Sequence, residues 1–573
     1  MKFLEDFLEK YIYLSGIRKT PKEFVREALN NFLLLAAASA TLSLVVAVFS
    51  LGILEPIIPL EQLQYLAYLI PAPLIIGLFL LFEPYFRAAE HMRGAERELL
   101  YVMALLTTYA ANGVAPHIAI DRLRMKYKEL FTEFSKIAER ISRIRVLFVV
   151  DELEAMEFEG RRVSSQLISD LLLSSASIER RGGDIYAVLR EKMRSIFNAV
   201  RENYKTLSNR MSFVADVILI AYGVLPMMLY TMFALFASEE LALQSIFYSF
   251  FVNPLIGLAL VYLIDLMYPK TPVKYDKYYR LIAYSLPVGA AVFVAVYAPW
   301  YFGLISARPE VISGLPWTGV AIAAAAIATC APAAFRYHFD QRRLTAIDYA
   351  LPSFVRDVAE EVKKGSTPSL AIITLSNTRS YGSALDKVIK KIALALEAGR
   401  TFEEAVQSVM REVSWYCRMS LTLMVEADLM GAKPEVFDEV AEVTREIIDS
   451  LRIARSSVMP LKIFGLITAV LVIGITSMLV RQVLEPIAMM AEGFYAAASS
   501  FPTLMGSLGV QLITPKMLPQ LVDTVITGSV VTMILMGLMT GKMTDGTLAG
   551  GFVYVIIDML LSMTAILLLF LVL

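Results

Sequence analysis

Four aspartates lie in or beside long apolar runs of this sequence. Among apolar side chains, a carboxylate is the group best able to transfer a proton or bind a cation. The four aspartates are Asp216, Asp265, Asp523 and Asp558. A carboxylate at membrane depth is costly, so it usually belongs to a proton path, an ion pair or another functional site. The first three lie near the ends of their apolar runs, where water lowers the cost. Asp558 lies nearer the middle of "VYVIIDMLL", and we expect it to pair with a polar group of another span.

Motifs for cofactors and catalysis are missing from the polar segments. The candidate phosphate loop Gly541-Lys542 is followed by Met543 and lacks the glycine five positions before Gly541 that a P-loop needs. The two cysteines form no CxxC pattern, and the three histidines have no metal-ligand spacing. These histidines are His91, His117 and His338. We therefore expect no cofactor, no metal site and no enzymatic activity, and the net charge of -1 gives no indication of nucleic acid binding.

The apolar runs themselves are long enough to cross a membrane. The 573 residues are 57% hydrophobic and 19% charged, with a mean hydropathy of +0.60, whereas soluble domains carry about 25% charged residues. Nine runs have membrane-spanning length. They lie at residues 32–54, 66–82, 213–237, 246–268, 281–303, 317–335, 460–480, 521–540 and 549–573. The sequence therefore predicts an all-α polytopic membrane protein with about nine transmembrane helices.

Basic residues divide the connecting segments into two classes. Lysine and arginine are concentrated in residues 1–31 and in two long polar blocks, 83–212 and 336–459, and are sparse in the alternate segments. The positive-inside rule predicts that these three segments face the cytoplasm and that Leu573 lies outside. The expected order begins with a cytoplasmic amphipathic N-terminal region (1–31), transmembrane helices 1–2 (32–82) and cytoplasmic helical domain 1 (83–212). Transmembrane helices 3–4 (213–268) and 5–6 (281–335) then lead to cytoplasmic helical domain 2 (336–459). Transmembrane helix 7 (460–480), an external segment (481–520) and transmembrane helices 8–9 (521–573) complete the chain.

The two polar blocks share a helical corner. "NGVAPHIAIDRL" in the first block matches "KGSTPSLAIITL" in the second, 252 positions later, so that Gly113 and Pro116 correspond to Gly365 and Pro368. A glycine typically ends one helix, and a proline is typical of the first turn of the next. The same corner is therefore predicted twice.

The two blocks also end alike, each with a charged helix that stops at a glycine, Gly182 or Gly431. Two spans, one polar block and two further spans form an order that occurs twice in one orientation. We interpret this order as a parallel internal duplication, related by an axis along the membrane normal. Each block is expected to be a helical bundle, because apolar residues such as Leu351, Val355 and Val358 recur at helical spacing.

Together these features resemble the platform membrane protein of type IV pilus-like machines, the type II secretion F-domain family, in its archaeal form. The motifs are "IDYALPSFVRDVAEEVKKGSTPSLAI" (347–372), "GRTFEEAV" (399–406) and the two glycine-terminated exits. The resemblance covers nearly the whole chain and implies two partners, a hexameric cytoplasmic secretion-type ATPase and pilin or archaellin subunits. It implies a cell-membrane protein that transmits movement, and we also expect contact with membrane lipid and assembly into a homodimer or larger oligomer. The first block departs from the pattern, because "LFVVDELEAM" stands opposite "GRTFEEAV".

Charged residues at predicted helix ends are the candidate contacts for the ATPase. They are Arg180, Arg181, Asp184, Arg342, Arg343, Glu403 and Glu404. Arg342 and Arg343 would serve equally well as anchors to anionic lipid. Glu404 stands three residues after Thr401, the spacing of a capping box, which is a purely structural role.

Other protein classes make different demands on the sequence. A polytopic transporter or channel with a parallel internal repeat is the alternative, and it would need discontinuous spans with charges at matching depths in both halves. An intramembrane aspartyl protease would need paired aspartates and a GxGD motif, and "RRGGDIY" lacks the first glycine of that motif. The resemblance adds a second possible partner for Asp558, the charged N-terminal region of a pilin subunit. The interpretation carried forward is the assembly platform.

Overall fold

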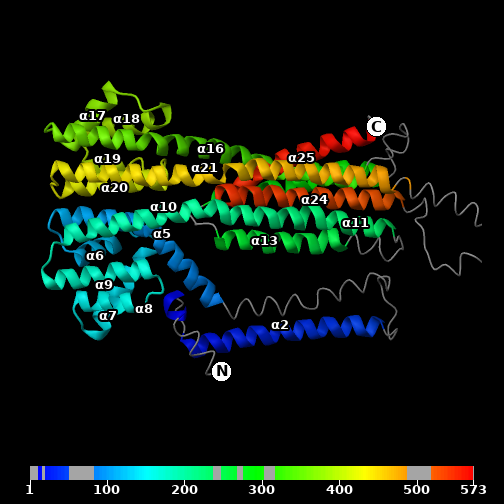
Figure 1. Cartoon of the computed structure of the whole chain (residues 1–573), viewed down its shortest axis with the longest axis horizontal. Coiled ribbons are helices and arrows are strands. Elements are labelled where there is room, and N and C mark those ends of the chain that lie inside the picture. The colour runs from blue at the N-terminus through cyan, green and yellow to red at the C-terminus, as the bar shows by residue number, and fades with distance from the viewer. Residues whose placement is uncertain are drawn as a thin grey trace, which may run out of the picture. The chain divides into compact units, whose positions relative to one another are not determined.

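The computed structural model describes residues 11–15, 20–50, 83–235, 247–267, 275–301, 316–484, 486 and 518–571. Within this part of the chain the secondary structure is α-helix with short π-helical turns and no strand, so the expected all-α fold is confirmed (Figure 1). The chain forms two compact units, Met1–Ile196 and Phe197–Leu573. Residues 83–212 are called block 1 below, and residues 336–459 block 2.

The first unit is a bundle of mostly amphipathic helices around α5. Its helices are α2 (Pro21–Ser50), α5 (Glu83–Ala111), α6 (Pro116–Lys126), α7 (Phe134–Phe148), α8 (Glu152–Arg162), α9 (Gln166–Arg181) and the beginning of α10 (Ile185–Ile218). Leu99, Leu106 and Tyr109 follow helical spacing along α5 and are buried, and α6, α7 and α9 pack around this helix. The predicted span 32–54 coincides with α2 as far as Ser50, while residues 51–54 and the predicted span 66–82 lie outside the described residues.

The second unit contains block 2. Its helices are α16 (Trp317–Lys363), α17 (Pro368–Thr378), α18 (Ser383–Glu397), α19 (Phe402–Gln407), α20 (Trp415–Leu429) and α21 (Pro434–Leu479). The apolar stripe predicted from the sequence of α16 is buried, including Leu351, Val355 and Val358. It packs against α17, α18 and α20, and Val388 and Ile392 of α18 complete the core. Apolar residues at helical spacing therefore build this block as the sequence predicts.

Apolar helices form the remainder of the second unit. They are η1 (Leu219–Val224), α11 (Leu225–Leu235), η2 (Tyr248–Val252), α13 (Asn253–Met267), α14 (Asp276–Tyr301), η3 (Val480–Leu484), α24 (Leu518–Asp545) and α25 (Leu548–Leu571). Among the described residues, six segments are long and apolar enough to cross a membrane: Ile185–Met232, Asp276–Pro299, Trp317–Lys363, Pro434–Val483, Val522–Asp545 and Leu548–Leu568. The expected span at 246–268 appears as the shorter apolar helix Asn253–Met267. Most of the predicted external segment, 481–520, lies outside the described residues.

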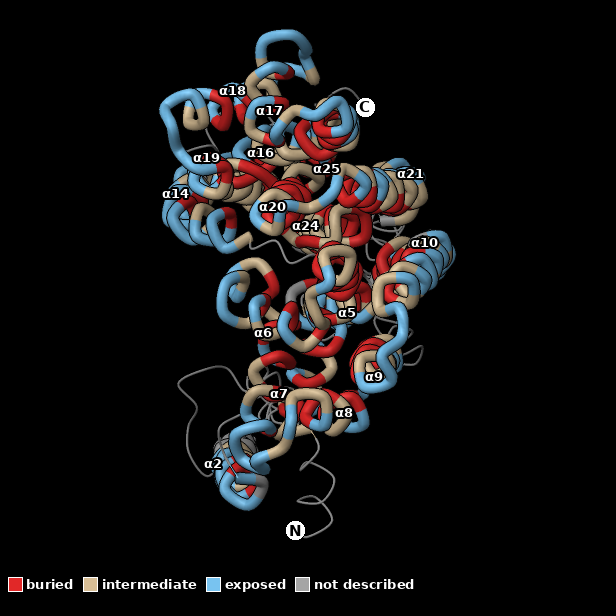
Figure 2. The backbone as a smooth tube through the Cα atoms, turned by 90° about the vertical axis from the view of Figure 1, so that its left-hand side faces the viewer, coloured by how far each residue is buried: buried red, intermediate tan, exposed pale blue. Residues whose placement is uncertain are grey.

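Three of these segments are much longer than a membrane is thick. Ile185–Met232 has 48 residues, Trp317–Lys363 has 47 and Pro434–Val483 has 50. At about 1.5 Å per residue each is about 70 Å long, whereas the hydrocarbon core of a bilayer is about 30 Å thick. Each therefore continues without a break from a polar block into the apolar helices, as Figure 1 shows for α16 and α21. Figure 2 shows that α10 keeps one buried and one exposed face.

In the hairpin of α24 and α25 the two helix backbones are in direct contact. A Cβ atom added to Gly541 would lie 2.0 Å from the backbone nitrogen of Gly551, and one added to Gly537 would lie 2.6 Å from that of Val555. Only glycine lets two helix backbones approach so closely in an apolar environment. The hairpin is therefore fixed by backbone contact.

Candidate functional sites in the polar blocks and the apolar helices

The four corner glycines adopt the left-handed conformation. Their φ angles are 74° at Gly113, 69° at Gly182, 99° at Gly365 and 60° at Gly431. A Cβ atom added at any of them would meet no other atom within 4 Å. The positive φ, and not a lack of space, is therefore what favours glycine.

The helix that follows each corner begins where the sequence places it. Pro116 is the first residue of α6, and Pro368 is the first residue of α17. Proline suits this position because the first backbone N–H groups of a helix have no partner inside it. Each block therefore turns its chain back through a glycine stop and a proline start.

A second feature shared by the blocks is a serine that fastens two helices together. Ser165 caps α9 by accepting a hydrogen bond from the backbone of Ile168, and its hydroxyl donates to Glu96 of α5. Ser414 caps α20 by accepting from the backbone of Cys417, and its hydroxyl donates to Asp348 of α16. We call each pair, Glu96–Ser165 and Asp348–Ser414, a serine latch.

The serine latches follow the spacing of the predicted repeat. Glu96 and Asp348 are 252 positions apart, as are the corner glycines Gly113 and Gly365, and Ser165 and Ser414 are 249 apart, as are the exit glycines. The sequence analysis missed both pairs. Applying the two offsets to every polar residue would have found them.

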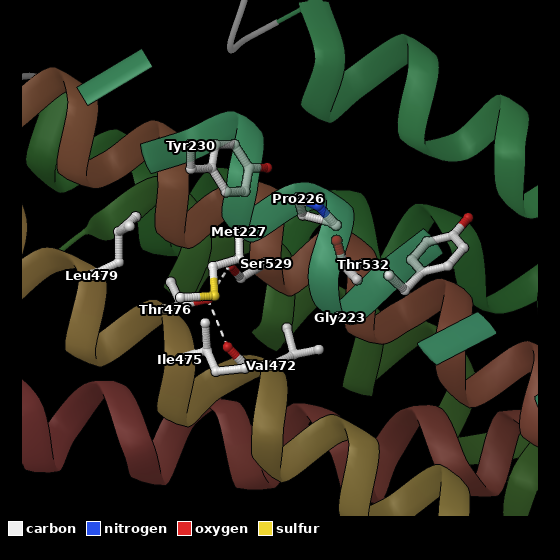
Figure 3. A pocket seen from close by; sticks show the side chains of 11 residues that line it. Gly223, Pro226, Met227, Tyr230, Val472, Ile475, Thr476, Leu479, Ser529 and Thr532 are labelled. Atoms are coloured by element: carbon white, nitrogen blue, oxygen red, sulfur yellow. Dashed lines mark hydrogen bonds between the residues drawn. The ribbon is translucent and has the colours of Figure 1, made fainter. Parts of the chain in front are cut away.

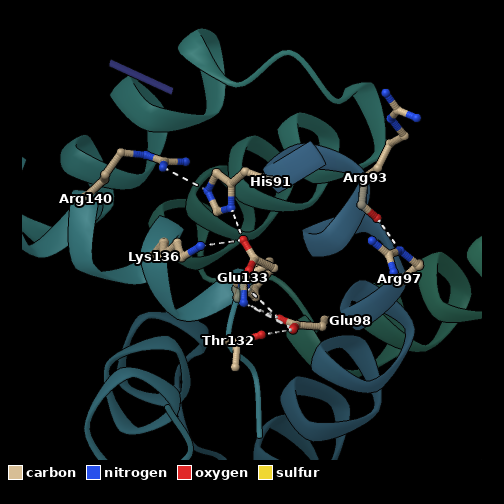
Figure 4. Close-up of polar contacts among 9 residues, drawn as sticks. His91, Arg93, Arg97, Glu98, Thr132, Glu133, Lys136 and Arg140 are labelled. Atoms are coloured by element: carbon tan, nitrogen blue, oxygen red, sulfur yellow. Dashed lines mark hydrogen bonds and ion pairs between the residues drawn. The ribbon is translucent and has the colours of Figure 1, made fainter. Parts of the chain in front are cut away.

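Block 1 also contains a buried ionic network (Figure 4). Arg140 is 5% exposed and Glu159 is 0% exposed, and Arg140 Nε lies 2.6 Å from Glu159 Oε1. Arg140 Nη1 lies 3.0 Å from His91 Nε2, and His91 Nδ1 lies 2.5 Å from Glu133 Oε2. Burial lowers the pKa of His91, even though the hydrogen bond to Glu133 opposes this shift. A neutral His91 fits the geometry, because Nε2 faces a guanidinium donor and Nδ1 can then donate to Glu133.

Two carboxyl groups of this network have opposite pKa shifts. Burial would raise the pKa of Glu133, but hydrogen bonds from His91 and Lys136 outweigh it and lower the pKa to about 2. Glu98, 1% exposed, accepts hydrogen bonds from the backbone of Glu133 and from that of Phe134 at the start of α7. Burial outweighs these bonds and raises the pKa of Glu98 to about 7. The network therefore contains a group that titrates near neutral pH.

The network also holds residues 11–15 against block 1. Tyr13 donates a hydrogen bond to Glu159 Oε2 at 2.9 Å, and the Arg162 guanidinium lies 5.3 Å from the centre of the Tyr13 ring. Burial raises the pKa of Tyr13 to about 12, and the carboxylate of Glu159 adds to this shift. Ile12 packs on Val25 at the beginning of α2. The segment before α2 is therefore bound to α8.

Block 2 places its charges differently. Ile389, 249 positions after Arg140, is 2% exposed and belongs to an apolar core. The ion pair of Lys391 with Glu412 in this block, at 2.6 Å, lies at the surface. Exposed pairs contribute at most about 1 kcal/mol each. The two blocks thus share a backbone plan but not an interior.

The charged residues selected from the sequence have mainly local roles. Asp184 Oδ1 accepts a hydrogen bond from the backbone of Ala187 and so caps α10, and Arg180 pairs with Glu157 at 3.1 Å. Arg181 is exposed. These residues all belong to the first unit.

The candidates in block 2 are similarly divided. Glu404 and Thr401 form the expected capping box of α19, which accounts for Glu404 structurally. Glu403 stands beside it in the first turn. Arg343 lies 3.6 Å from Glu412, and Arg342 is exposed. Arg342 and Arg343 remain candidates for a partner or for lipid.

Several ends of the apolar helices are joined by charged and tyrosine side chains. Lys542 of α24 pairs with Asp265 of α13, and Lys462 of α21 lies 3.5 Å from Asp545. Tyr337 of α16 donates to Asp545 at 3.2 Å. Asp265, expected near a span end, is therefore paired there. These contacts place the end of α13, the end of α24 and the middle of α16 and α21 at one level.

Asp558 is the buried carboxylate within these helices. It is 1% exposed, and its Oδ1 has no hydrogen-bond partner among the described residues. The expected hydrogen bond to another span is thus not observed for that oxygen.

A small hydroxyl-lined pocket, with a cavity volume of about 10 Å³, lies beside η1 (Figure 3). Thr476 and Ser529 lie 2.8 Å apart in it, and Asn253 donates to Thr532 at 2.7 Å. Pro226, which also lines the pocket, has no backbone N–H to give to the preceding turn. π-Helical turns are frequent at functional sites. The sequence analysis did not identify this pocket, because hydroxyl residues in apolar helices have no distinguishing spacing.

Comparison of the chain with protein-family models, curated proteins and solved structures gave no match.

Proposed function

We propose that the chain is the membrane platform of a type IV pilus-like machine, in the archaeal pilus or archaellum form. In this role it would couple a cytoplasmic secretion-type ATPase to the assembly of pilin-like subunits. The observation that carries the proposal is the continuity of three helices of about 70 Å from the polar blocks into the apolar bundle. A continuous helix transmits rotation or displacement along its length, whereas a loop between block and span would absorb it.

The internal duplication supports this role. The helices α6 and α17 both have 11 residues, α7 and α18 both have 15, and the serine latches and left-handed glycines occupy corresponding positions. Two copies of one block under one membrane frame would offer a motor two similar levers. Nine spans, two cytoplasmic blocks and an external C-terminus complete the proposed topology.

The topology can be tested by cysteine labelling from one side of the membrane. Met125 of α6 is 70% exposed and Leu370 of α17 is 53% exposed, so cysteines at both positions are accessible to a reagent. A membrane-impermeant maleimide should label both only after the membrane is opened on its cytoplasmic side. Labelling of one position from outside and of the other from inside would contradict the parallel duplication.

The role of helix continuity can be tested with glycines. Ser456→Gly with Met459→Gly changes two exposed residues of α21 just before its apolar half, and two glycines weaken a helix by about 2 kcal/mol. We expect this variant to retain the ATPase on co-purification but to assemble few filaments, counted by electron microscopy. Lys387→Gly with Lys390→Gly in α18, which ends inside block 2, is the matched control and should assemble normally. Equal filament numbers in both variants would contradict the proposal.

A transporter is the second candidate, and the pocket beside η1 is the observation that favours it. Unwound or irregular helix turns beside polar side chains are typical of transport sites. Thr476→Val with Thr532→Val would remove two hydroxyls from the pocket lining. Loss of filaments in the α21 glycine variant with unchanged filaments in the pocket variant would favour the platform over the transporter.

A further inference from the structure

The helix α14 presents one exposed face along most of its length. The exposed residues at helical spacing on this face are Asp276, Arg280, Tyr284, Val288, Ala291 and Ala295. Another face of the helix packs against α16, where Ser285 donates a hydrogen bond to the backbone oxygen of Thr329 at 2.6 Å. Gly289 lies against the same threonine. We call the six exposed residues the α14 stripe.

The α14 stripe changes in character along the helix. Asp276 and Arg280 stand in its first two turns, and Tyr284, which is 78% exposed, follows them. The last three residues, which end at Ala295, have alkyl side chains. From Tyr284 to Ala295 the helix rises by about 16 Å. One leaflet of a bilayer contributes about 15 Å of hydrocarbon, half of the full core. The apolar part of the stripe therefore has the length of an acyl chain in one leaflet.

A cleft with a volume of about 520 Å³ lies at the polar end of the α14 stripe. It is lined by Asp276, Lys277, Arg280, Leu281 and Tyr284. Sites for small ligands have volumes of about 300–1,000 Å³. The charge of Lys277 is balanced by Asp340 of α16, whose carboxylate lies 2.7 Å away. A ligand in the cleft therefore meets Asp276 and Arg280 as the remaining charges of the lining.

The two remaining charges are one helical turn apart. Neither Asp276 nor Arg280 forms an ion pair with another residue in the described part of the chain. The ammonium group of ethanolamine can donate hydrogen bonds to a carboxylate, and a phosphate binds a guanidinium through two parallel hydrogen bonds. Choline has no N–H to donate, and an anionic headgroup would bring its phosphate beside Asp276 without a cation. The pair of charges therefore matches phosphatidylethanolamine.

The cleft lies at the level expected for a lipid headgroup. Lys277 and Tyr278 both contact the carboxylate of Asp340, at the point where α16 passes from its apolar half into block 2. Among the six described segments that could cross a membrane, Asp276–Pro299 is the least buried: 11% of its most apolar stretch is buried, against 67% for Val522–Asp545. Bilayer lipid therefore has access to the stripe, with its headgroup at the cleft.

We propose that the α14 stripe binds one molecule of phosphatidylethanolamine, with the ammonium group on Asp276, the phosphate on Arg280 and an acyl chain along the apolar part of the stripe. This lipid site goes beyond the proposed platform function. It requires only that the apolar helices cross a membrane, and a transporter built from the same helices would carry it too.

The test measures the phospholipid that the full chain retains. Protein in a mild detergent is titrated with phosphatidylethanolamine, phosphatidylcholine or phosphatidylglycerol of identical acyl chains, and bound lipid is counted by native mass spectrometry. We expect phosphatidylethanolamine to bind about fivefold more tightly than the other two. Asp276→Asn should abolish its preference over phosphatidylcholine, and Arg280→Gln should weaken binding of all three phospholipids about fivefold.

The matched control is Arg445→Gln, which removes the same charge from an exposed residue of block 2 and should leave all three affinities unchanged. Circular dichroism melting checks that each variant is folded. Equal affinities of the unaltered chain for the three lipids, or tighter binding of phosphatidylglycerol, would overturn the proposal. Displacement of the lipid by an equal concentration of phosphorylethanolamine, the headgroup without acyl chains, would assign the cleft to a soluble ligand instead. Loss of a dimer in Arg280→Gln with unchanged lipid binding would assign the stripe to a second copy of the chain.

Discussion

Blocks 1 and 2 follow one path with different interiors. Both run from a long helix through a left-handed glycine to a proline-started helix of 11 residues, and both fasten their fifth helix to their first with a serine latch. Yet Arg140 of block 1 is buried with Glu159, while Ile389 in the corresponding place of block 2 lies in an apolar core. The backbone path is therefore compatible with either interior, and the choice of interior reflects what each block contacts.

The buried charges of block 1 have a neighbour that block 2 does not show. Tyr13, from the segment before α2, donates its hydroxyl proton to Glu159. A buried ion pair is seldom more stabilising than an apolar core of the same volume. Here the pair also binds the polar hydroxyl of Tyr13, so block 1 holds the segment before α2 through its buried charges.

Another difference lies at the end of the second short helix. α7 is followed by Val149, which has a φ of 53°, whereas α18 is followed, one residue later, by Gly399 with a φ of 80°. A β-branched residue in the left-handed region is strained by about 1–2 kcal/mol. Val149 is 89% exposed, and its neighbours Leu147 and Phe148 are also exposed. The departure of "LFVVDELEAM" from "GRTFEEAV" thus has a structural counterpart, a strained turn with exposed apolar side chains.

The largest effect should come from removing one partner of the buried ion pair. Arg140→Met leaves Glu159 charged and buried, and we expect the free energy of unfolding to fall by about 3–5 kcal/mol. Lys391→Met, which breaks the exposed pair with Glu412 in block 2, should cost less than about 1 kcal/mol. Chemical unfolding of the detergent-solubilised protein measures both. The double variant Arg140→Met with Glu159→Gln should recover part of the lost free energy of unfolding. Equal losses in Arg140→Met and Lys391→Met would contradict the proposed difference between the two interiors.

The next effect is the pH dependence that Glu98 contributes to the stability of block 1; Asp348 in block 2, whose pKa burial raises to about 6, contributes a smaller one of the same sign. The pKa of Glu98 is about 7 in the folded protein against 4.5 for an ordinary glutamate. The folded state therefore gains stability from the neutral form of Glu98. This contribution is complete below pH 4.5 and is lost as pH rises through 7. This loss amounts to about 3 kcal/mol. Glu98→Gln should remove it, as measured by unfolding at pH 5 and pH 8.

The matched control for this pH dependence is Glu129→Gln, which changes an exposed carboxylate of the same block and should leave the profile unchanged. His91 affects the free energy of unfolding in the opposite direction. Burial lowers its pKa, so the stability that depends on neutral His91 is lost as pH falls. A profile that is identical with and without Glu98 would show that this carboxyl group is already ionised in the folded protein.

The serine latches should behave alike in the two blocks. Ser165→Ala and Ser414→Ala each remove a helix cap and the hydrogen bond to a carboxylate, at a cost of about 2 kcal/mol. Ser456→Ala, which removes an exposed hydroxyl bonded within its own helix, should change stability by less than about 0.5 kcal/mol. Thermal melting of the three variants compares them. A large cost in one block alone would mean that the latch is not a common element of the repeat.

The smallest effect is expected at the corners. Gly113→Ala and Gly365→Ala place a Cβ in open space at a positive φ, so each should cost about 1 kcal/mol. The same pair of variants tests whether the corners are equivalent, because their costs should agree within about 0.5 kcal/mol. Unfolding midpoints in denaturant give the comparison.

The sequence predicts what depends on local spacing. The buried stripe of Leu351, Val355 and Val358 follows from helical periodicity, and the left-handed corner at Gly365 follows from a glycine stop before a proline start. The capping box at Thr401 was visible for the same reason, since its two residues stand three positions apart. Such features need no knowledge of which helices touch.

The sequence cannot predict contacts between helices that are distant along the chain. His91, Arg140 and Glu159 come from α5, α7 and α8, and no spacing relates them. The charges selected at helix ends proved to be mainly caps and surface pairs, as Asp184 shows, because a charged side chain beside free backbone groups binds those groups first. The pocket beside η1 was missed because a π-helical turn has no sequence signature.

The contact of Gly541 with Gly551 restricts how the apolar part can change shape. Two backbones at this separation cannot slide or separate without either a collision or an empty gap, so α24 and α25 form one strut. The seam between α24 and α21 is different, because Thr476 and Ser529 meet there through interchangeable hydroxyl groups. A displacement delivered along α21 would therefore reach α24 and α25 as one paired body.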